Sequence, residues 1–256
     1  MFHVIIQARM GSTRLPGKAL KTHKKISPLD ILISRLEKIE DISKIIIATT
    51  KQPKDDIFKE FCKKKKIELF RGDSDNVLKR YYFAAKKFES ENIIRLTSDC
   101  PFVDSFTLKK MMKIQTKKKY DYLANTYPLP CSYPDGSDIE IFTIKTLTKT
   151  FKSAFLPSEK EHVTKYMWSS KKFNTSQLKL KKSLSKYRYT IDIKEDFKLF
   201  SFIIDSFPKK KFLTVDMNEI INLIKNNPSK VFYQKNLKRN FGWQKSLKRD
   251  KKYLYV

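Results

Sequence analysis

Residues 3–18 read HVIIQARMGSTRLPGK, and this stretch decides the fold of the chain. Its apolar start is typical of a short buried β-strand, and the remainder is typical of a loop with three cations, two glycines and two hydroxyls. The chain has five glycines in 256 residues, so two in one loop indicate positions where a side chain would block the backbone. Backbone N–H groups and cations at the end of a strand are suited to bind phosphate, although a basic surface loop would have a similar composition.

Apolar runs and amphipathic segments alternate along the first 125 residues. Ser27 is placed to cap a helix that starts at Pro28 and has one apolar face. This alternation predicts an α/β fold with a mostly parallel sheet flanked by helices, in which ligands bind outside the carboxyl ends of the strands. The expected strands cover residues 4–6, 45–48, 67–70 and 93–96, and the expected helices cover about 28–39, 55–65 and 77–85.

The second half of the chain has mixed patterns. Residues 138–142 alternate like a strand, and residues 158–161 fit a capping box that opens a helix reaching Trp168. Residues 187–191 read as another strand, followed by a helix, and no clear periodicity continues beyond about residue 226. Since there is no internal repeat and no long linker, we expect one domain with a small inserted mixed subregion.

Composition excludes several classes of protein. The net charge of +28 comes mostly from scattered lysines without a docking motif, so we expect steering of a small anionic substrate and no nucleic-acid partner. Three dispersed cysteines argue against a zinc site or a disulfide framework. No apolar run approaches the ~18 residues that span a bilayer, and no secretory signal pattern begins the chain, which together predict a cytoplasmic protein.

The loop at 8–18 has the charge to hold a nucleoside triphosphate. Arg9, Arg14 and Lys18 would cancel most of its roughly four negative charges, each unit pair being worth about 4 kcal/mol at 4 Å in a partly screened site. Arginine provides a planar fork for phosphate oxygens and lysine a compact point charge. Gly11 and Ser12 would add backbone N–H groups and a hydroxyl.

Two aspartates follow predicted strands and are candidate metal ligands. Asp99 comes after the strand at 93–96, and Asp192 comes after the one at 187–191. Bare carboxylates beside a triphosphate would repel it, and they fit there if Mg²⁺ lies between, because magnesium binds one or two carboxylates plus substrate phosphates. Each aspartate precedes a helix-like segment, so a helix N-cap is the alternative for both.

Polar residues further along the chain are candidates for a polyhydroxylated substrate. Asp135, Gly136, Asp138 and Glu140 lie in one stretch whose Pro-Asp-Gly sequence also predicts an ordinary β-turn before a strand. His162 is a further candidate, and a structural helix residue is the equal alternative for it.

At this point the residues resemble a known family. Residues 5–20, IIQARMGSTRLPGKAL, are similar to the opening signature of the spore-coat polysaccharide biosynthesis protein F group. That group belongs with the sugar-acid cytidylyltransferases, which include the acylneuraminate and 3-deoxy-manno-octulosonate enzymes. Further segments match in order: FRGDSDNVLKRYY from residue 70, RLTSDCPFVD from 95, YPDGSDIEIF from 133, EHVT from 161 and TIDIKEDF from 190.

The resemblance implies a Rossmann-like nucleotidyltransferase domain, related to GT-A folds, over 1–225. A subregion at about 125–185 would serve substrate binding or dimerisation, and 226–256 would be a basic C-terminal extension. The family implies a homodimer that uses Mg²⁺ to transfer CMP from CTP to a nonulosonic or octulosonic sugar acid. Pyrophosphate leaves, and the CMP-sugar serves surface polysaccharide biosynthesis.

The resemblance also implies roles for single residues. Arg9, Arg14 and Lys18 fall at phosphate-binding positions, and Asp99 and Asp192 at the metal-binding aspartates. By the same resemblance Arg9, Lys18, Asp99 and Asp192 are the expected catalytic residues, and Ala8, Thr49 and Arg71 lie near the nucleotide-base pocket.

Two other functions are consistent with parts of the sequence. A glycosyltransferase that consumes a nucleotide sugar often has an Asp-x-Asp metal motif, and residues 73–75 fit it, although a helix cap also explains them. A nucleic-acid-binding module would account for the positive charge alone.

Overall fold

A computed structural model describes residues 1–208, 210–237, 239 and 241–254. In this part of the chain the strands are β1 (Phe2–Gln7), β2 (Ile42–Thr50), β3 (Glu68–Gly72), β4 (Asn92–Thr97), β5 (Tyr122–Ala124), β6 (Glu140–Thr143) and β7 (Thr175–Gln177). They form one sheet in the order β3-β2-β1-β4-β6-β5-β7. The first four strands pair in parallel, and β6 runs antiparallel to both β4 and β5. The predicted α/β fold with a mostly parallel sheet is confirmed.

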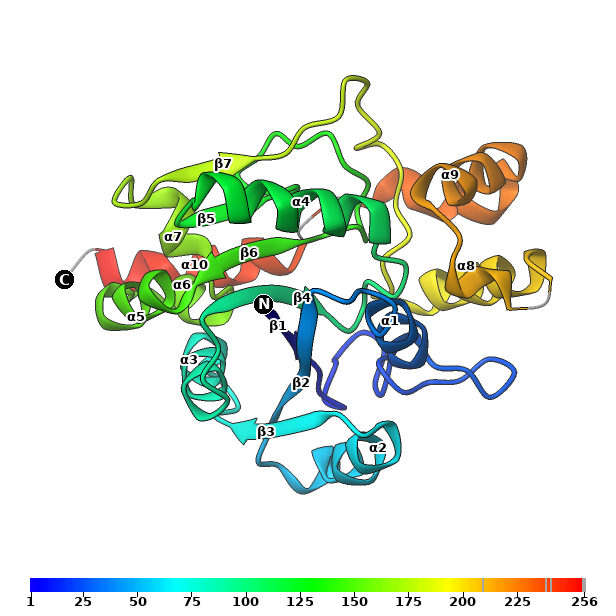
Figure 1. The fold of residues 1–256 in the computed structure, drawn as a ribbon. Helices are drawn as coiled ribbons and strands as arrows, with labels where there is room; N and C mark the ends of the chain where they lie inside the picture. Colours follow the sequence, from blue (N-terminus) through cyan, green and yellow to red (C-terminus); the bar gives the residue numbers. More distant parts are fainter. Residues whose placement is uncertain (209, 238, 240, 255–256) are drawn as a thin grey trace.

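Helices cover both faces of this sheet (Figure 1). The α-helices are α1 (Pro28–Leu36), α2 (Ile57–Lys65), α3 (Val77–Lys87), α4 (Ser105–Lys118), α5 (Ile144–Ser153), α6 (Pro157–Glu161), α7 (Lys165–Ser169), α8 (Lys194–Ser206), α9 (Met217–Asn226) and α10 (Phe241–Leu254), and the 3₁₀ helices are η1 (Pro53–Asp55), η2 (Lys211–Leu213) and η3 (Pro228–Asn236). Buried residues of α1, α2 and α4 pack on one face, and those of α3, α5 and α7 on the other. None of the helices among the described residues has the length and apolar composition needed to cross a bilayer.

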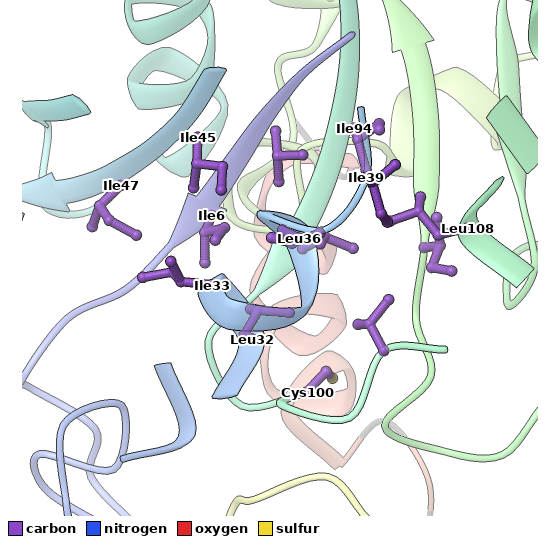
Figure 2. Packing of buried hydrophobic residues seen from close by; sticks show 14 of the residues in the cluster. Ile6, Leu32, Ile33, Leu36, Ile39, Ile45, Ile47, Ile94, Cys100 and Leu108 are labelled. Carbon is purple, nitrogen blue, oxygen red and sulfur yellow. The ribbon is translucent and has the colours of Figure 1, made fainter. Parts of the chain in front are cut away.

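Helix α1 fixes the position of the loop before it. Ser27 Oγ accepts from the backbone N–H of Asp30 at 3.1 Å, and the Asp30 carboxylate accepts from the Ser27 N–H at 3.0 Å, as the capping signal predicts. Leu32 and Leu36 then pack with the strand residue Ile6 (Figure 2), and burying each leucine contributes about 1.5–3 kcal/mol. The loop at 8–18 is therefore held between a buried strand and a buried helix.

A third apolar cluster lies beside the sheet and is built mainly by α8 and α9. Leu15 from the loop at 8–18 and Ile31 from α1 join it, together with Tyr189 and Ile191. The backbone N–H of Ile191 donates to the carbonyl of Asp99 at 2.8 Å. Packing in this cluster therefore places the segment before α8 next to the carboxyl end of β4.

The predicted strand at 187–191 is wrong. These residues form one isolated bridge, between Arg188 and Asp135, rather than a strand of the sheet. The N–H of Tyr189 donates to the carbonyl of Asp135 at 2.8 Å, and the N–H of Asp135 donates to the carbonyl of Tyr187 at 2.9 Å. The apolar alternation that predicted a strand instead reflects burial of Tyr189 and Ile191 in the third cluster.

The predicted helix that opens at residue 158 and reaches Trp168 is also wrong, because two short helices, α6 and α7, replace it. The helical backbone is interrupted between them, where Val163 has a φ of 56°. The first helix begins at Pro157, and the Glu159 carboxylate accepts from the N–H of Leu156 at 3.1 Å. Ser158 is not a cap, because its hydroxyl donates to Asp250 of α10.

No element was expected beyond residue 226, yet the chain forms η3 and the 14-residue helix α10 there. Two of its buried side chains are polar, Ser246 at 1% exposed and Asp250 at 4% exposed. They lie four residues apart and face the body of the protein. Since polar anchors hold this helix, the apolar periodicity that would have predicted it is missing.

Candidate active site

Hydrogen bonds fix the shape of the loop at 8–18. The N–H of Gly17 donates to the carbonyl of Met10 at 3.0 Å, and Gly17 has a φ of 69°, which glycine adopts without strain. The N–H of Met10 donates to the carboxylate of Asp55 at 2.7 Å. Asp55 is fully buried and also accepts from the hydroxyl of Thr50, so the loop is anchored to the end of β2.

Lys18, the last residue of this loop, lies between two carboxylates. Its Nζ is 2.7 Å from an oxygen of Asp99 and 2.7 Å from an oxygen of Asp192. Arg14 Nη2 is 3.1 Å from the other oxygen of Asp192. The structure thus brings together four of the side chains predicted for phosphate and metal binding, from three segments that are distant in the sequence.

Neither aspartate caps a helix, so the alternative explanation for both is excluded. Helix α4 is capped by Asp104, whose carboxylate accepts from the N–H of Thr107 at 2.8 Å. At α8 the carboxylate of Asp196 accepts from the N–H groups of Asp192 and Ile193, at 2.8 and 3.1 Å. The carboxylates of Asp99 and Asp192 are therefore directed at Lys18 rather than at a helix terminus.

The protonation of this group follows from burial and pairing. Burial disfavours the charge of Asp99, but the charge and hydrogen bond of Lys18 outweigh it and lower the pKa of Asp99 to about 2. Burial likewise opposes the charge of Lys18, and the two carboxylates raise the pKa of Lys18 above its ordinary value. Asp99 and Lys18 are consequently both ionised at neutral pH.

Arg188 connects this group to the segment predicted to bind substrate. It donates to the carboxylate of Asp135, and its Nη2 lies 2.8 Å from Asp196 and 3.6 Å from Asp192. Burial and the charge of Asp138 raise the pKa of Asp135 to about 6, against the opposing effect of Arg188. The Asp135 loop is therefore part of the same ionic cluster as Asp192.

Arg239, from the C-terminal part of the chain, also reaches this loop. Its Nη1 donates to the carbonyl of Tyr133 at 2.9 Å, and its Nη2 lies 3.4 Å from an oxygen of Asp138. The thiol of Cys100 lies 3.6 Å from the other oxygen of Asp138. Asp138 thus links the tail of the protein to the residue that follows Asp99.

The backbone conformation between Asp135 and Asp138 requires a glycine at position 136. It has a φ of 108°, and a Cβ built on it would lie 2.5 Å from the backbone nitrogen of Thr190. We expect Gly136→Ala to lower the free energy of unfolding by about 2 to 4 kcal/mol, through strain and overpacking. Urea denaturation measures the change.

Gly11→Ala is the matched control, because a Cβ there would meet only the flexible end of Lys54, at 2.7 Å from Nζ. We expect this variant to lower the free energy of unfolding by less than about 1 kcal/mol. Equal costs for the two variants would show that the contact with Thr190 does not constrain the loop.

Glu140 is inside the protein rather than open to a substrate. It is 2% exposed and forms an ion pair with Arg95 of β4. Its other oxygen accepts from the hydroxyl of Tyr122 at 2.6 Å and from the hydroxyl of Thr164. Both carboxylate oxygens therefore have protein partners.

His162 lies at the end of α6, where it contacts α10. Its ring stacks on Trp243 with centroids 4.3 Å apart, and its Nε2 is 2.6 Å from Ser246 Oγ. Burial, followed by the positive charges of Arg95 and Lys165, lowers the pKa of His162 to about 3. This geometry joins the C-terminal helix to the body of the protein.

The low pKa of His162 predicts a loss of stability in acid. Between about pH 3 and 6.5 the unfolded chain binds a proton at this residue and the folded chain does not, so stability falls as the pH falls through this window. Lowering the pH from 8 to 5 should cost at most about 2 kcal/mol through His162.

Urea denaturation at several pH values checks this expectation. His162→Phe retains a ring against Trp243 and cannot take up the proton, so its free energy of unfolding should depend less on pH than that of the wild type. Identical pH dependence in the two proteins would contradict the assignment.

The remaining residues predicted for the nucleotide lie along the same loop and strand ends. Ala8 is buried and Arg9 is exposed, while Gly11 is partly exposed. Ser12 Oγ accepts from the N–H of Leu15 at 3.4 Å, which stabilises the turn.

Thr49 and Arg71 are the last residues but one of the neighbouring strands β2 and β3. Thr49 is fully buried in β2, and its hydroxyl is without a hydrogen-bond partner among the described residues. Arg71 Nε donates to the carbonyl of Thr50 at 3.1 Å, and its Nη2 pairs with Asp56 at 2.5 Å. Arg71 is thus held against the segment that follows β2.

Several residues of the site were not predicted. Asp55 follows β2 in a polar run, where the start of a helix was expected rather than an anchor of the loop at 8–18. Arg188 lies in the segment predicted as a strand, and Arg239 lies where no element was expected, so neither was predicted as a site residue. For Asp55 there was a local signal, since it lies shortly after the carboxyl end of a parallel strand, where ligands bind in such sheets.

Most of the chain is similar to known cytidylyltransferases. Residues 3–238 match the family model described as cytidylyltransferase. Spore coat polysaccharide biosynthesis protein SpsF of Bacillus subtilis is 33% identical over 232 residues, which cover 88% of this chain and 94% of that protein.

Solved structures agree with this relationship. A cytidylyltransferase from Leptospira borgpetersenii serovar Hardjo-bovis has a TM-score of 0.83 and 33% identity, covering 93% of this chain and 98% of that one. CMP:2-keto-3-deoxy-manno-octonic acid synthetase in complex with CTP has a TM-score of 0.60 and 14% identity, covering 80% and 99%, and shares the fold. On the match of the family model and the identity to SpsF, the chain belongs to the cytidylyltransferase family.

Proposed function

We propose that this protein transfers CMP from CTP to a sugar acid of the nonulosonic or octulosonic type and releases pyrophosphate, for the synthesis of a surface polysaccharide. The observation that carries the proposal is the position of Lys18, at the end of a glycine-containing basic loop and between two carboxylates. The family and the similarity to SpsF support the nucleotide and the polysaccharide context.

The loop residues would bind and neutralise the triphosphate. Arg9 and Arg14 are exposed at the loop, and the ammonium of Lys18, in the same loop, lies between two carboxylates. Preorganised cations stabilise the charge that develops on the phosphate oxygens in the transition state. Attack by a sugar hydroxyl on the α-phosphorus then expels pyrophosphate.

The two aspartates fit a magnesium ion. An oxygen of each aspartate lies 2.7 Å from Lys18 Nζ, and carboxylates are ligands that Mg²⁺ prefers, so the ion would bind there in exchange for the ammonium of Lys18. The described residues contain no cluster of three or more potential protein ligands, so substrate phosphates would complete the coordination. When bound there, Mg²⁺ would polarise the phosphate oxygens and lower the pKa of the attacking hydroxyl.

The segment at 133–138 would bind the acceptor. Asp135 and Asp138 are held next to Asp192 and Cys100 by Arg188 and Arg239, so their oxygens lie where a polyhydroxylated molecule would approach. The Asp-x-Asp sequence at 73–75 does not favour a glycosyltransferase. The Asp73 carboxylate accepts from the N–H groups of residues 75 and 76, at 3.0 and 2.9 Å, as a turn before α3 requires.

Pyrophosphate release tests the proposal. The protein is incubated with CTP, Mg²⁺ and a panel of sugar acids that includes 3-deoxy-manno-octulosonate and N-acetylneuraminate. We expect release only with CTP and an acidic sugar, and loss of release when EDTA removes the metal. Binding of UDP-sugars in preference to CTP in a thermal-shift comparison would contradict it.

A further inference from the structure

Gln7, the last residue of β1, is held by a buried ionic network. Arg95 of β4 pairs with Glu140 through Nη1, and its Nη2 donates to Gln7 Oε1 at 3.0 Å. The side chain of Arg95 is 11% exposed and that of Glu140 is 2% exposed, so the pair is shielded from water. The network therefore fixes one end of an amide that lies directly before the loop at 8–18.

The orientation of the Gln7 amide follows from the chemistry of its partner. A guanidinium only donates, so the amide oxygen faces Arg95 and the NH₂ group points away from it. Among the residues that the structure describes, the NH₂ group of Gln7 has no hydrogen-bond acceptor. Gln7 is only partly buried, so this donor is accessible at the carboxyl edge of the sheet.

The direction of the strand places this donor on a different face from the phosphate loop. Side chains alternate along a strand, so Gln7 shares a face with Ile5, which packs with α3, α5 and α7. The loop at 8–18 leads into α1 on the other face, where Ala8 and Ala19 are buried. On the Gln7 face, the network continues through Glu140 to Thr164.

We propose that the side-chain NH₂ of Gln7 donates a hydrogen bond to an oxygen of the sugar-acid acceptor, and that Arg95 and Glu140 are positioning residues that hold this donor in place. The inference rests on the proposed function and assigns Gln7 to the acceptor, because Glu140, which pairs with Arg95, lies two residues after Asp138 of the segment proposed to bind the acceptor. A carboxylate or hydroxyl oxygen is the class of group that this amide would recognise.

Gln7→Glu tests the proposal with little risk to the fold. A carboxylate at this position still accepts from Arg95, but it replaces the outward donor with a negative charge that repels an acidic sugar. We expect the KM for the best sugar acid of the panel to rise by about 100-fold or more, while the KM for CTP changes by less than about threefold. Gln7→Leu, which removes the donor without adding charge, should raise the acceptor KM by about 10-fold.

Gln52→Glu is the matched control, because Gln52 is exposed at the same edge of the sheet and its side chain, unlike its backbone, forms no hydrogen bond with the residues that the structure describes. It should have wild-type constants for both substrates. An unchanged acceptor KM in Gln7→Glu, or an increase confined to CTP, would overturn the proposal. Wild-type turnover in the same assay separates either result from failure of the proposed function, which would leave the wild type without sugar-acid-dependent pyrophosphate release.

Discussion

Asp192→Asn is expected to lower CTP-dependent pyrophosphate release by about 100- to 1,000-fold while the protein remains folded. The amide keeps the size of the side chain but loses the charge that holds Lys18 and that would bind Mg²⁺. Lys18 retains its partner Asp99, so the free energy of unfolding should change by less than about 1 kcal/mol. Initial rates with saturating CTP and sugar acid measure the first effect, and urea denaturation measures the second.

Asp205→Asn is the control for removing a carboxylate from the same part of the chain. Asp205 lies on α8, is 41% exposed and pairs with His23 and Lys24 rather than with loop residues 8–18. Its variant should retain wild-type release. If Asp192→Asn also retained it, the assignment of Asp192 as a metal ligand would be withdrawn.

Arg95→Met is expected to lower the free energy of unfolding by about 3 to 5 kcal/mol, the largest effect on stability among these predictions. The substitution leaves the carboxylate of Glu140 buried without its cation, and an uncompensated buried charge is strongly unfavourable. Urea denaturation followed by circular dichroism gives the change in unfolding free energy.

The double variant Arg95→Met with Glu140→Gln is the control. It removes both charges, and the amide oxygen still accepts from the hydroxyls of Tyr122 and Thr164. It should regain more than half of the stability lost in Arg95→Met. A cost below about 1 kcal/mol for the single variant would mean that water reaches Glu140.

The first half of the fold was predictable because its signals are local. The strand at 4–6 and the helix after Ser27 are specified by contiguous apolar residues and by a capping box whose partners lie three residues apart. The second half lacks such signals. The buried side chains that the structure describes in α10, Ser246 and Asp250, are polar and give no apolar period. Val163, at a φ of 56°, ends a helix without proline or glycine.

The sequence by itself determined the α/β class, and it predicted the basic loop and the two aspartates as candidate site residues, because residue type and short spacing carry that information. Only the tertiary structure decided that Lys18 lies between Asp99 and Asp192, that Glu140 is buried against Arg95, and that Arg239 reaches Asp138. These contacts depend on the order of strands in the sheet and on the packing of α8 and α9 beside it. The strand order and this packing depend on the burial of many residues that are far apart in the sequence, and no pair of neighbouring residues specifies them.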